Sequence, residues 1–133
     1  MLAHTESVTL EAPAAIVYAY LADPGNLPKW ANVFCQSIEH DGNGWRAQTV
    51  AGQIGIRYEC HEVCRTIDIV SLIEPGVEDT AYTRVMPNGA GCEFTFTFYR
   101  DPDMSDELFD SQRWGLREEL RTLRAIIRQL SEG

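Results

Sequence analysis

The feature that most restricts the fold is an uninterrupted helical pattern over residues 105–133. Ser105 is a favourable N-cap, and Asp106 and Glu107 place negative charge in the first turn. No proline follows before Gly133, which predicts a helix of about seven turns and about 40 Å. Its apolar side chains form one stripe: Phe109, Leu116, Leu120, Leu123, Ile127 and Leu130. A stripe of this length requires a long apolar partner surface, such as one face of a sheet.

A second face of the same helix is basic. It carries five arginines: Arg113, Arg117, Arg121, Arg124 and Arg128. Three acidic residues alternate with them: Asp110, Glu118 and Glu119. Spacings of three and four residues favour ion pairs on one helix surface, so the pattern predicts a solvated face and not an anion-binding patch.

Most of the remaining chain predicts strands. Period-2 alternation is present in residues 5–11, and turn signals such as Asp41-Gly42 and Pro75-Gly76 separate six further segments. We place these six strands near residues 35–41, 44–51, 53–62, 66–73, 79–86 and 91–100. Between the first and second strands the spacing predicts two short helices, one with Ala14 to Leu21 on its apolar face and one carrying Leu27, Trp30, Ala31 and Phe34. The sequence thus predicts one α+β domain over residues 1–133.

Charge and composition exclude several classes of function. The net charge is −9, which repels phosphate backbones and disfavours nucleic-acid binding. The longest uncharged run, 12–22, is too short to span a bilayer, and the N-terminus has no pattern of a secretory signal, so we expect a cytoplasmic protein without membrane insertion. Four cysteines are expected as free thiols: Cys35, Cys60, Cys64 and Cys92.

No motif predicts a cofactor or a metal site. The cluster from Cys60 to Cys64 contains sulfur and imidazole ligands, but Cys60 and His61 point to opposite faces of a strand and lack the usual zinc spacing. Nucleophile-elbow, P-loop and dinucleotide-binding motifs are absent from the sequence. We therefore predict that the protein needs neither cofactor nor metal.

Several segments together resemble the SRPBCC (START-like) superfamily, and in particular its bacterial polyketide cyclase/dehydratase-like branch. These segments are VTLEAP at 8–13, YLADPGNLPKW at 20–30, QIGIRY at 53–58, RVMPNGAGCEFTFTF at 84–98 and MSDELF at 104–109. The resemblance implies a helix-grip fold, in which a curved antiparallel sheet of seven strands wraps the terminal helix around a cavity. Many relatives carry a histidine after the residue matched by Asp68, and Ile69 stands there in this chain.

The helix-grip arrangement and strand alternation together predict the cavity lining. Eleven residues are expected there: Trp30 near the mouth, Ile38, Trp45, Ile56, Tyr58, Phe94, Phe96, Phe98, Leu116, Leu120 and Leu123. This lining suits a flat hydrophobic molecule, aromatic, polyketide-like or acyl. The alternative is a core that these side chains fill completely.

Three polar residues are candidates for catalysis. Tyr82 and Arg84 share one face of a strand, and if they point inward they can polarise a carbonyl or hold a carboxylate. If they point outward, they form an exposed row of side chains together with neighbouring carboxylates. His40 shares its parity with Ile38, and histidine is the side chain most often used for acid or base catalysis, although His40 lies beside a turn.

The sequence leaves three functions open. The first is a carrier or sensor of a hydrophobic small molecule, which agrees with the absence of a clear catalytic constellation. The second is a cyclase or dehydratase that uses His40, Tyr82 and Arg84 for proton transfer. The third is a co-chaperone-like protein-interaction module, for which only the acidic surface argues. Pairing of the exposed sheet edge with a second copy, as a homodimer, also remains open.

Overall fold

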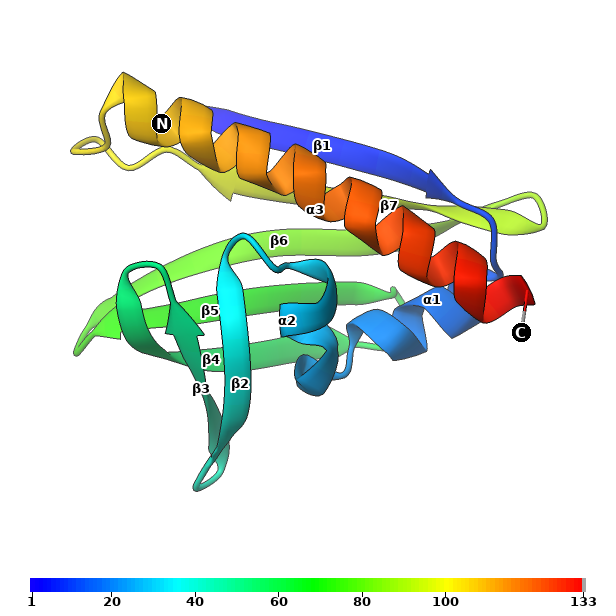
Figure 1. Cartoon of the computed structure of the whole chain (residues 1–133), viewed down its shortest axis with the longest axis horizontal. Helices are drawn as coiled ribbons and strands as arrows, with labels where there is room; N and C mark the ends of the chain where they lie inside the picture. The colour runs from blue at the N-terminus through cyan, green and yellow to red at the C-terminus, as the bar shows by residue number, and fades with distance from the viewer. Residues whose placement is uncertain (133) are drawn as a thin grey trace.

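The computed structural model describes residues 1–132 and shows one antiparallel sheet together with a long C-terminal helix (Figure 1). In chain order the elements are β1 (Ala3–Leu10), α1 (Ala14–Leu21), the 3-10 helix η1 (Pro24–Asn26), α2 (Leu27–Trp30), β2 (Cys35–Asp41), β3 (Gly44–Thr49), β4 (Gly52–His61), β5 (Thr66–Glu74), β6 (Val77–Asn88), β7 (Gly91–Tyr99) and α3 (Asp106–Glu132). The fold is the predicted helix-grip fold of class α+β.

The sheet has the strand order β1-β7-β6-β5-β4-β3-β2. Strands β2 to β7 pair as consecutive hairpins, whereas β1 pairs with the last strand, β7. The two sheet edges are therefore β1 and β2, and the segment containing α1 and α2 must cross from one edge to the other (Figure 1). This crossing carries α2 beneath the terminal helix, where the candidate site lies.

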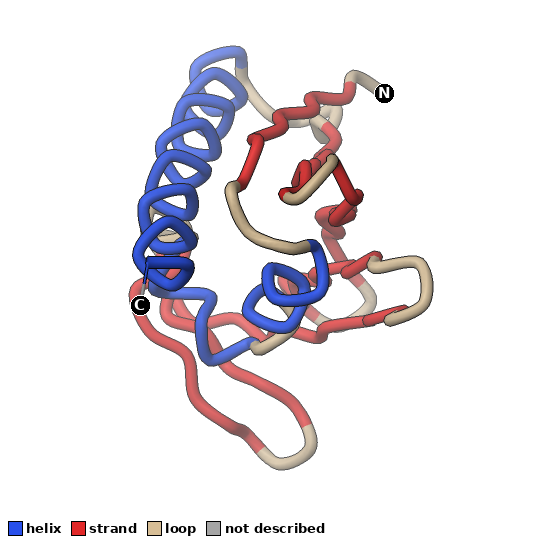
Figure 2. Tube along the Cα trace, turned by 90° about the vertical axis from the view of Figure 1, so that its right-hand side faces the viewer, coloured by secondary structure: helices blue, strands red, loops and turns tan. Residues whose placement is uncertain are grey.

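One sheet face, here called the inner face, is turned toward the helices. The register places Phe94 opposite Val8 and Val85, and Ile69 opposite Tyr58 and Ala81, so that apolar side chains continue across neighbouring strands. Figure 2 shows α3 along one side of the molecule and the strands along the other, with the shorter helices between them. The hydrophobic core occupies the space between these layers.

The terminal helix begins as predicted. The Ser105 hydroxyl accepts a hydrogen bond from the backbone N–H of Leu108 at 3.1 Å, which caps the first turn. Four residues of the apolar stripe, Leu116, Leu120, Leu123 and Ile127, are almost completely buried. The prediction that Leu130 belongs to the buried stripe was wrong. The last turns of the helix extend beyond the core, and this side chain is 53% exposed.

The strands begin and end within two residues of their predicted bounds, and two elements differ by more in total length. Strand β6 is longer than residues 79–86, because pairing continues to Val77 and Asn88 at the two adjoining tight turns. The second short helix ends at Trp30 instead of continuing to Phe34. Only Ala31 of the residues that follow donates its N–H to a helical carbonyl, that of Leu27, so the N–H groups of Val33 and Phe34 are available to other acceptors.

Candidate functional site

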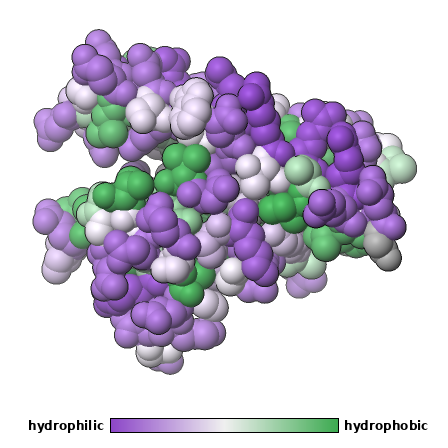
Figure 3. All heavy atoms as spheres, in the orientation of Figure 1, coloured by the Kyte–Doolittle hydropathy of each residue, from purple (hydrophilic) through white to green (hydrophobic). Residues whose placement is uncertain are grey.

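A cavity of about 270 Å³ lies between the inner face of the sheet, α2 and the first half of α3. Hydrophobic atoms are visible around the cleft that separates the α3 and β1 side of the molecule from the β2 and β3 side (Figure 3). The apolar part of the lining consists of Leu27, Trp30, Ala31, Val33, Phe34, Val50, Ile69, Ala81, Phe96, Phe98, Leu108, Gly115 and Leu116. Because Val50 and Leu108 are 82% and 49% exposed, the cavity communicates with solvent past apolar side chains.

Polar side chains are a minority of the lining. They are two carboxylic acids, three hydroxyls and an amide: Glu119, Asp79, Ser71, Thr80, Ser111 and Gln112. None of the described lining residues is Lys, Arg or His. Partial burial, and then repulsion from Asp101, raise the pKa of the Asp79 carboxyl. The walls therefore supply negative charge and hydroxyl groups but no cation.

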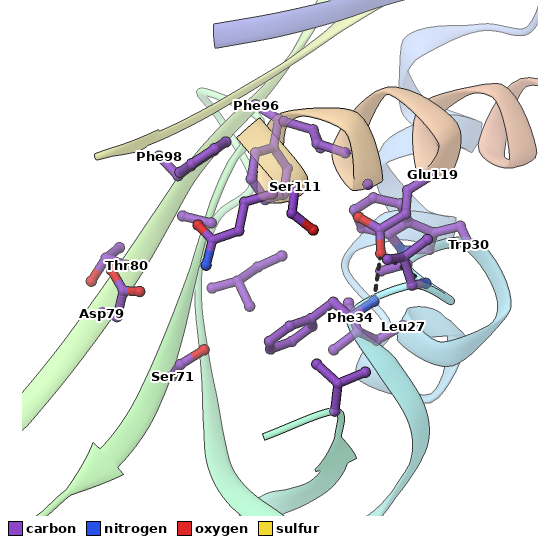
Figure 4. Close-up of a pocket in the computed structure, with 18 of the residues that line it drawn as sticks. Leu27, Trp30, Phe34, Ser71, Asp79, Thr80, Phe96, Phe98, Ser111 and Glu119 are labelled. Atoms are coloured by element: carbon purple, nitrogen blue, oxygen red, sulfur yellow. Dashed lines mark hydrogen bonds between the residues drawn. The ribbon is translucent and has the colours of Figure 1, made fainter. Parts of the chain in front are cut away.

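Glu119 is the most buried ionisable residue of the cavity, with only 6% of its surface exposed. Its Oε2 accepts hydrogen bonds from the backbone N–H groups of Phe34 at 2.9 Å and Val33 at 3.2 Å. Figure 4 shows this carboxyl group extending from α3 toward the segment that follows α2. Burial raises the pKa of Glu119 to about 7, although the two N–H groups favour the ionised form. At neutral pH the carboxyl group can thus either accept or donate a proton.

The prediction that Glu119 belongs to the solvated face was wrong. Two arginines of that face form ion pairs of the predicted kind within the helix, Arg113 with Asp110 and Arg121 with Glu118. Two others pair with acids outside the helix, Arg117 with Glu6 and Arg128 with Glu11. Glu119 lies three residues after Leu116 and four before Leu123, so it shares the buried stripe. This spacing from Leu116 and Leu123 is the feature of the sequence that indicates a buried position for Glu119.

The local sequence explains why Glu119 reaches the backbone of Val33 and Phe34. Gly115 lies one turn earlier on α3, and a Cβ at this position would be 3.0 Å from Val33 Cγ1. A glycine in mid-helix costs about 1 kcal/mol relative to alanine. It allows α3 to approach the 31–34 segment closely enough for the Glu119 hydrogen bonds.

The Trp30 indole is a second buried group with hydrogen-bonding capacity in the cavity wall. It is 1% exposed and contacts Phe94 and Phe96 edge to face, with ring centroids 5.9 and 6.4 Å apart. Its indole Nε1 has no hydrogen-bond partner within residues 1–132. Trp30 therefore lies deep in the cavity wall and not at the mouth, where the sequence suggested it.

The eleven predicted lining residues divide into two groups. Trp30, Phe96, Phe98 and Leu116 line the cavity. The others belong to the surrounding core or pack against it: Ile38, Trp45, Ile56, Tyr58, Phe94, Leu120 and Leu123. Strand alternation assigned the inner face correctly, but it does not show where along that face the space remains unfilled.

The three candidates for catalysis lie outside this cavity. Tyr82 and Arg84 take the outward orientation, because Ala81, Thr83 and Val85 occupy the inner face of β6. Tyr82 is 44% exposed and packs against the Tyr99 ring, with centroids 5.7 Å apart. His40 has the inner-face parity but lies exposed at the end of the β2–β3 hairpin. Its ring packs against the Trp45 ring, with centroids 3.8 Å apart.

The four cysteines divide between the core and the surface. All four cysteines are free; Cys35 and Cys92 are buried, and Cys60 and Cys64 are exposed. Within residues 1–132, no three His, Cys, Asp or Glu side chains come together as a potential metal site. None of the described helices combines the length and apolar character needed to cross a membrane.

A cavity between a seven-stranded antiparallel sheet and a long terminal helix is the arrangement of the START-like helix-grip fold. Residues 1–129 match the family described as polyketide cyclase / dehydrase and lipid transport, and the chain belongs to this family. No curated protein matches the sequence.

Solved structures share this fold at low sequence identity. The aromatase/cyclase Zhui from a Streptomyces species is 20% identical with a TM-score of 0.71, covering 96% of this chain and 94% of its own. A START superfamily protein from Mycobacterium smegmatis is 12% identical with a TM-score of 0.72, covering 96% and 98%. The di-domain ARO/CYC protein BexL is 19% identical with a TM-score of 0.79; the match covers all of this chain but 48% of BexL.

Proposed function

We propose that this protein binds a hydrophobic small molecule between its sheet and α3, as a carrier or sensor. The observation that carries the proposal is the solvent-connected cavity of about 270 Å³ with aromatic walls from Trp30, Phe96 and Phe98. A cavity of about 150 Å³ with apolar walls is known to hold benzene. The present cavity therefore suits a ligand of about two fused rings. The family description, which includes lipid transport, agrees with this function.

Calorimetric titration with naphthalene tests this function directly. We expect saturable binding by the folded protein, since the ring system can replace solvent against the aromatic walls. Native mass spectrometry of the protein as purified complements the titration, because an extra mass released by organic solvent reveals a ligand acquired during expression. The same spectrum gives the number of subunits and so tests the homodimer prediction. Absence of naphthalene binding by correctly folded protein would contradict the proposal.

A cytoplasmic location is part of the same proposal. It agrees with the four free thiols, because cysteines remain reduced in that compartment.

A second candidate function is a cyclase or dehydratase activity. The observation that favours it is Glu119, a buried carboxyl group whose pKa of about 7 suits general acid or base catalysis. Its neighbours in the wall can hold a carbonyl chain: Ser111, Gln112 and the Trp30 indole. In this function Glu119 removes a proton from a carbon next to a carbonyl and returns it to the departing or forming oxygen.

Turnover of a poly-β-carbonyl substrate tests the enzyme function. If Glu119 transfers the proton, Glu119→Gln should lower kcat by at least about a hundredfold, the usual contribution of a positioned acid or base. Loss of turnover in Tyr82→Phe or Arg84→Ala, with Glu119→Gln fully active, would instead assign the chemistry to the outer face of the sheet. Substrate binding without turnover would favour the carrier function.

A further inference from the structure

The charges and hydrogen-bonding groups of the cavity restrict which hydrophobic molecules it can accept. This inference rests on the proposed binding function and concerns the selectivity of the same cavity. Its two ionisable wall residues, Glu119 on α3 and Asp79 on β6, are both acids. Asp101 also acts on Asp79. No cationic side chain in the described lining can neutralise an anionic ligand.

Glu119 retains capacity to bind a ligand. Both backbone donors, from Val33 and Phe34, contact Oε2, and Oε1 has no partner in the part of the chain that the structure describes. A carboxylate oxygen has more than one acceptor site, so Oε1 can accept a further hydrogen bond. A hydroxyl group of a ligand can donate to Oε1, and a donor to a charged acceptor forms one of the stronger hydrogen bonds in proteins.

Trp30 supplies a second unpaired group in the same wall. Its Nε1–H is a donor without an acceptor, in a side chain that is 1% exposed. A hydroxyl is both donor and acceptor, so a ligand hydroxyl can donate to Oε1 and still accept a hydrogen bond from a wall donor such as Ser111 or Gln112. A carboxylate can only accept, and it would place a second negative charge near Glu119.

We propose that Glu119 makes this cavity selective for an uncharged aromatic or apolar molecule that carries a hydroxyl group, and that the cavity rejects the corresponding carboxylate. The Glu119 Oε1 atom accepts the ligand hydroxyl, and the aromatic and aliphatic walls contact the rest of the ligand. Hydroxyl-bearing ring compounds are therefore ligands, and fatty or aromatic acids in their ionised form are not.

Three probes of equal ring size test this selectivity: naphthalene, naphthol and naphthoate, the last two substituted at the same ring position. Titrations at about pH 8 keep Glu119 ionised, while a phenolic hydroxyl, with a pKa near that of tyrosine at about 10, stays neutral. We expect naphthol to bind at least about tenfold more tightly than naphthalene, the effect of one hydrogen bond to a charged acceptor. Naphthoate should bind at least about tenfold more weakly than naphthalene.

Variants then assign the effect to Glu119. In Glu119→Gln, which removes the charge, naphthol should lose most of its advantage over naphthalene, and naphthoate should lose most of its disadvantage. Glu118→Gln is the matched control, because Glu118 is the next residue on α3 and pairs with Arg121 at the surface. It should leave all three affinities unchanged.

The outcomes separate this inference from the binding function. If naphthalene binds but naphthol binds no better, or if Glu119→Gln leaves the order of affinities unchanged, the role of Glu119 is wrong and the cavity still binds apolar molecules. If naphthoate binds most tightly, the charge argument is wrong. If none of the three probes binds, the binding function itself fails. The wild-type series decides the selectivity even if Glu119→Gln does not fold.

Discussion

Glu119 lies where burial and hydrogen bonding act in opposite directions on one carboxyl group. Removal from water favours the protonated form, while the N–H groups of Phe34 and Val33 favour the ionised form. Burial has the larger effect, because a single carboxylate oxygen accepts both hydrogen bonds and the described cavity lining contains no cationic side chain. A residue in this state links the stability of the fold to pH as well as shaping the cavity.

The first prediction concerns the pH dependence of stability. Because the pKa of Glu119 is raised from 4.5 to about 7, the folded state binds this proton more tightly than the unfolded state. The free energy of unfolding should therefore fall as pH rises from about 4.5 to about 7, by an amount on the order of 2–3 kcal/mol. Glu119→Gln should remove most of this decrease, as measured by denaturant unfolding across that pH range.

Glu118→Gln again provides the control, and it should retain the wild-type slope. In Glu119→Gln, Asp79, whose pKa is also raised, should leave a smaller residual slope. Equal slopes in Glu119→Gln and the wild type would contradict the assignment.

At the scale of the element, the strands and their order follow from local patterns. Turn signals such as Pro75-Gly76 fix the hairpins, and alternation in β7 correctly turns Phe94, Phe96 and Phe98 inward. The position of the cavity does not follow from alternation, because it depends on which side chains α3 fails to cover. The four-residue length of α2 was also not predictable from its apolar spacing, since tertiary contacts end it at Trp30.

Two phenylalanines on β7 test where the inner face of the sheet borders open space and where it borders filled core. Phe96 lines the cavity, whereas Phe94, two residues earlier on the same face, is 1% exposed in the filled core. Phe96→Trp should extend into the open space, weaken naphthalene binding by at least about tenfold and change stability by less than about 1 kcal/mol. Phe94→Trp should destabilise by about 1–3 kcal/mol through overpacking.

Denaturant unfolding and calorimetric titration of both variants check this prediction. Equal destabilisation of the two would mean that the wall at Phe96 has no free space.

At the scale of the whole molecule, acidic residues exceed basic ones by nine. Exposed ion pairs neutralise part of the surface but contribute little to stability individually. The excess negative charge instead opposes the compact state and favours solubility. It also agrees with a cavity that accepts uncharged ligands.

Salt should consequently stabilise the protein. Raising sodium chloride from about 10 mM to about 150 mM shortens the range of electrostatic repulsion from about 30 Å to about 8 Å. We expect the Tm to rise in scanning calorimetry, while the affinity for naphthalene remains unchanged because that ligand carries no charge. A lower Tm at the higher salt concentration would show that the surface ion pairs outweigh the repulsion.

The walls of the cavity come from residues far apart in the chain, from Leu27 on α2 to Glu119 on α3. During synthesis, therefore, the aromatic face of β7 leaves the ribosome before the helix that covers it. A ligand can be taken up only after the last segment has been made and has docked. Its binding energy then opposes unfolding of the entire chain, so that a loaded protein should resist proteolysis at every site that requires global opening.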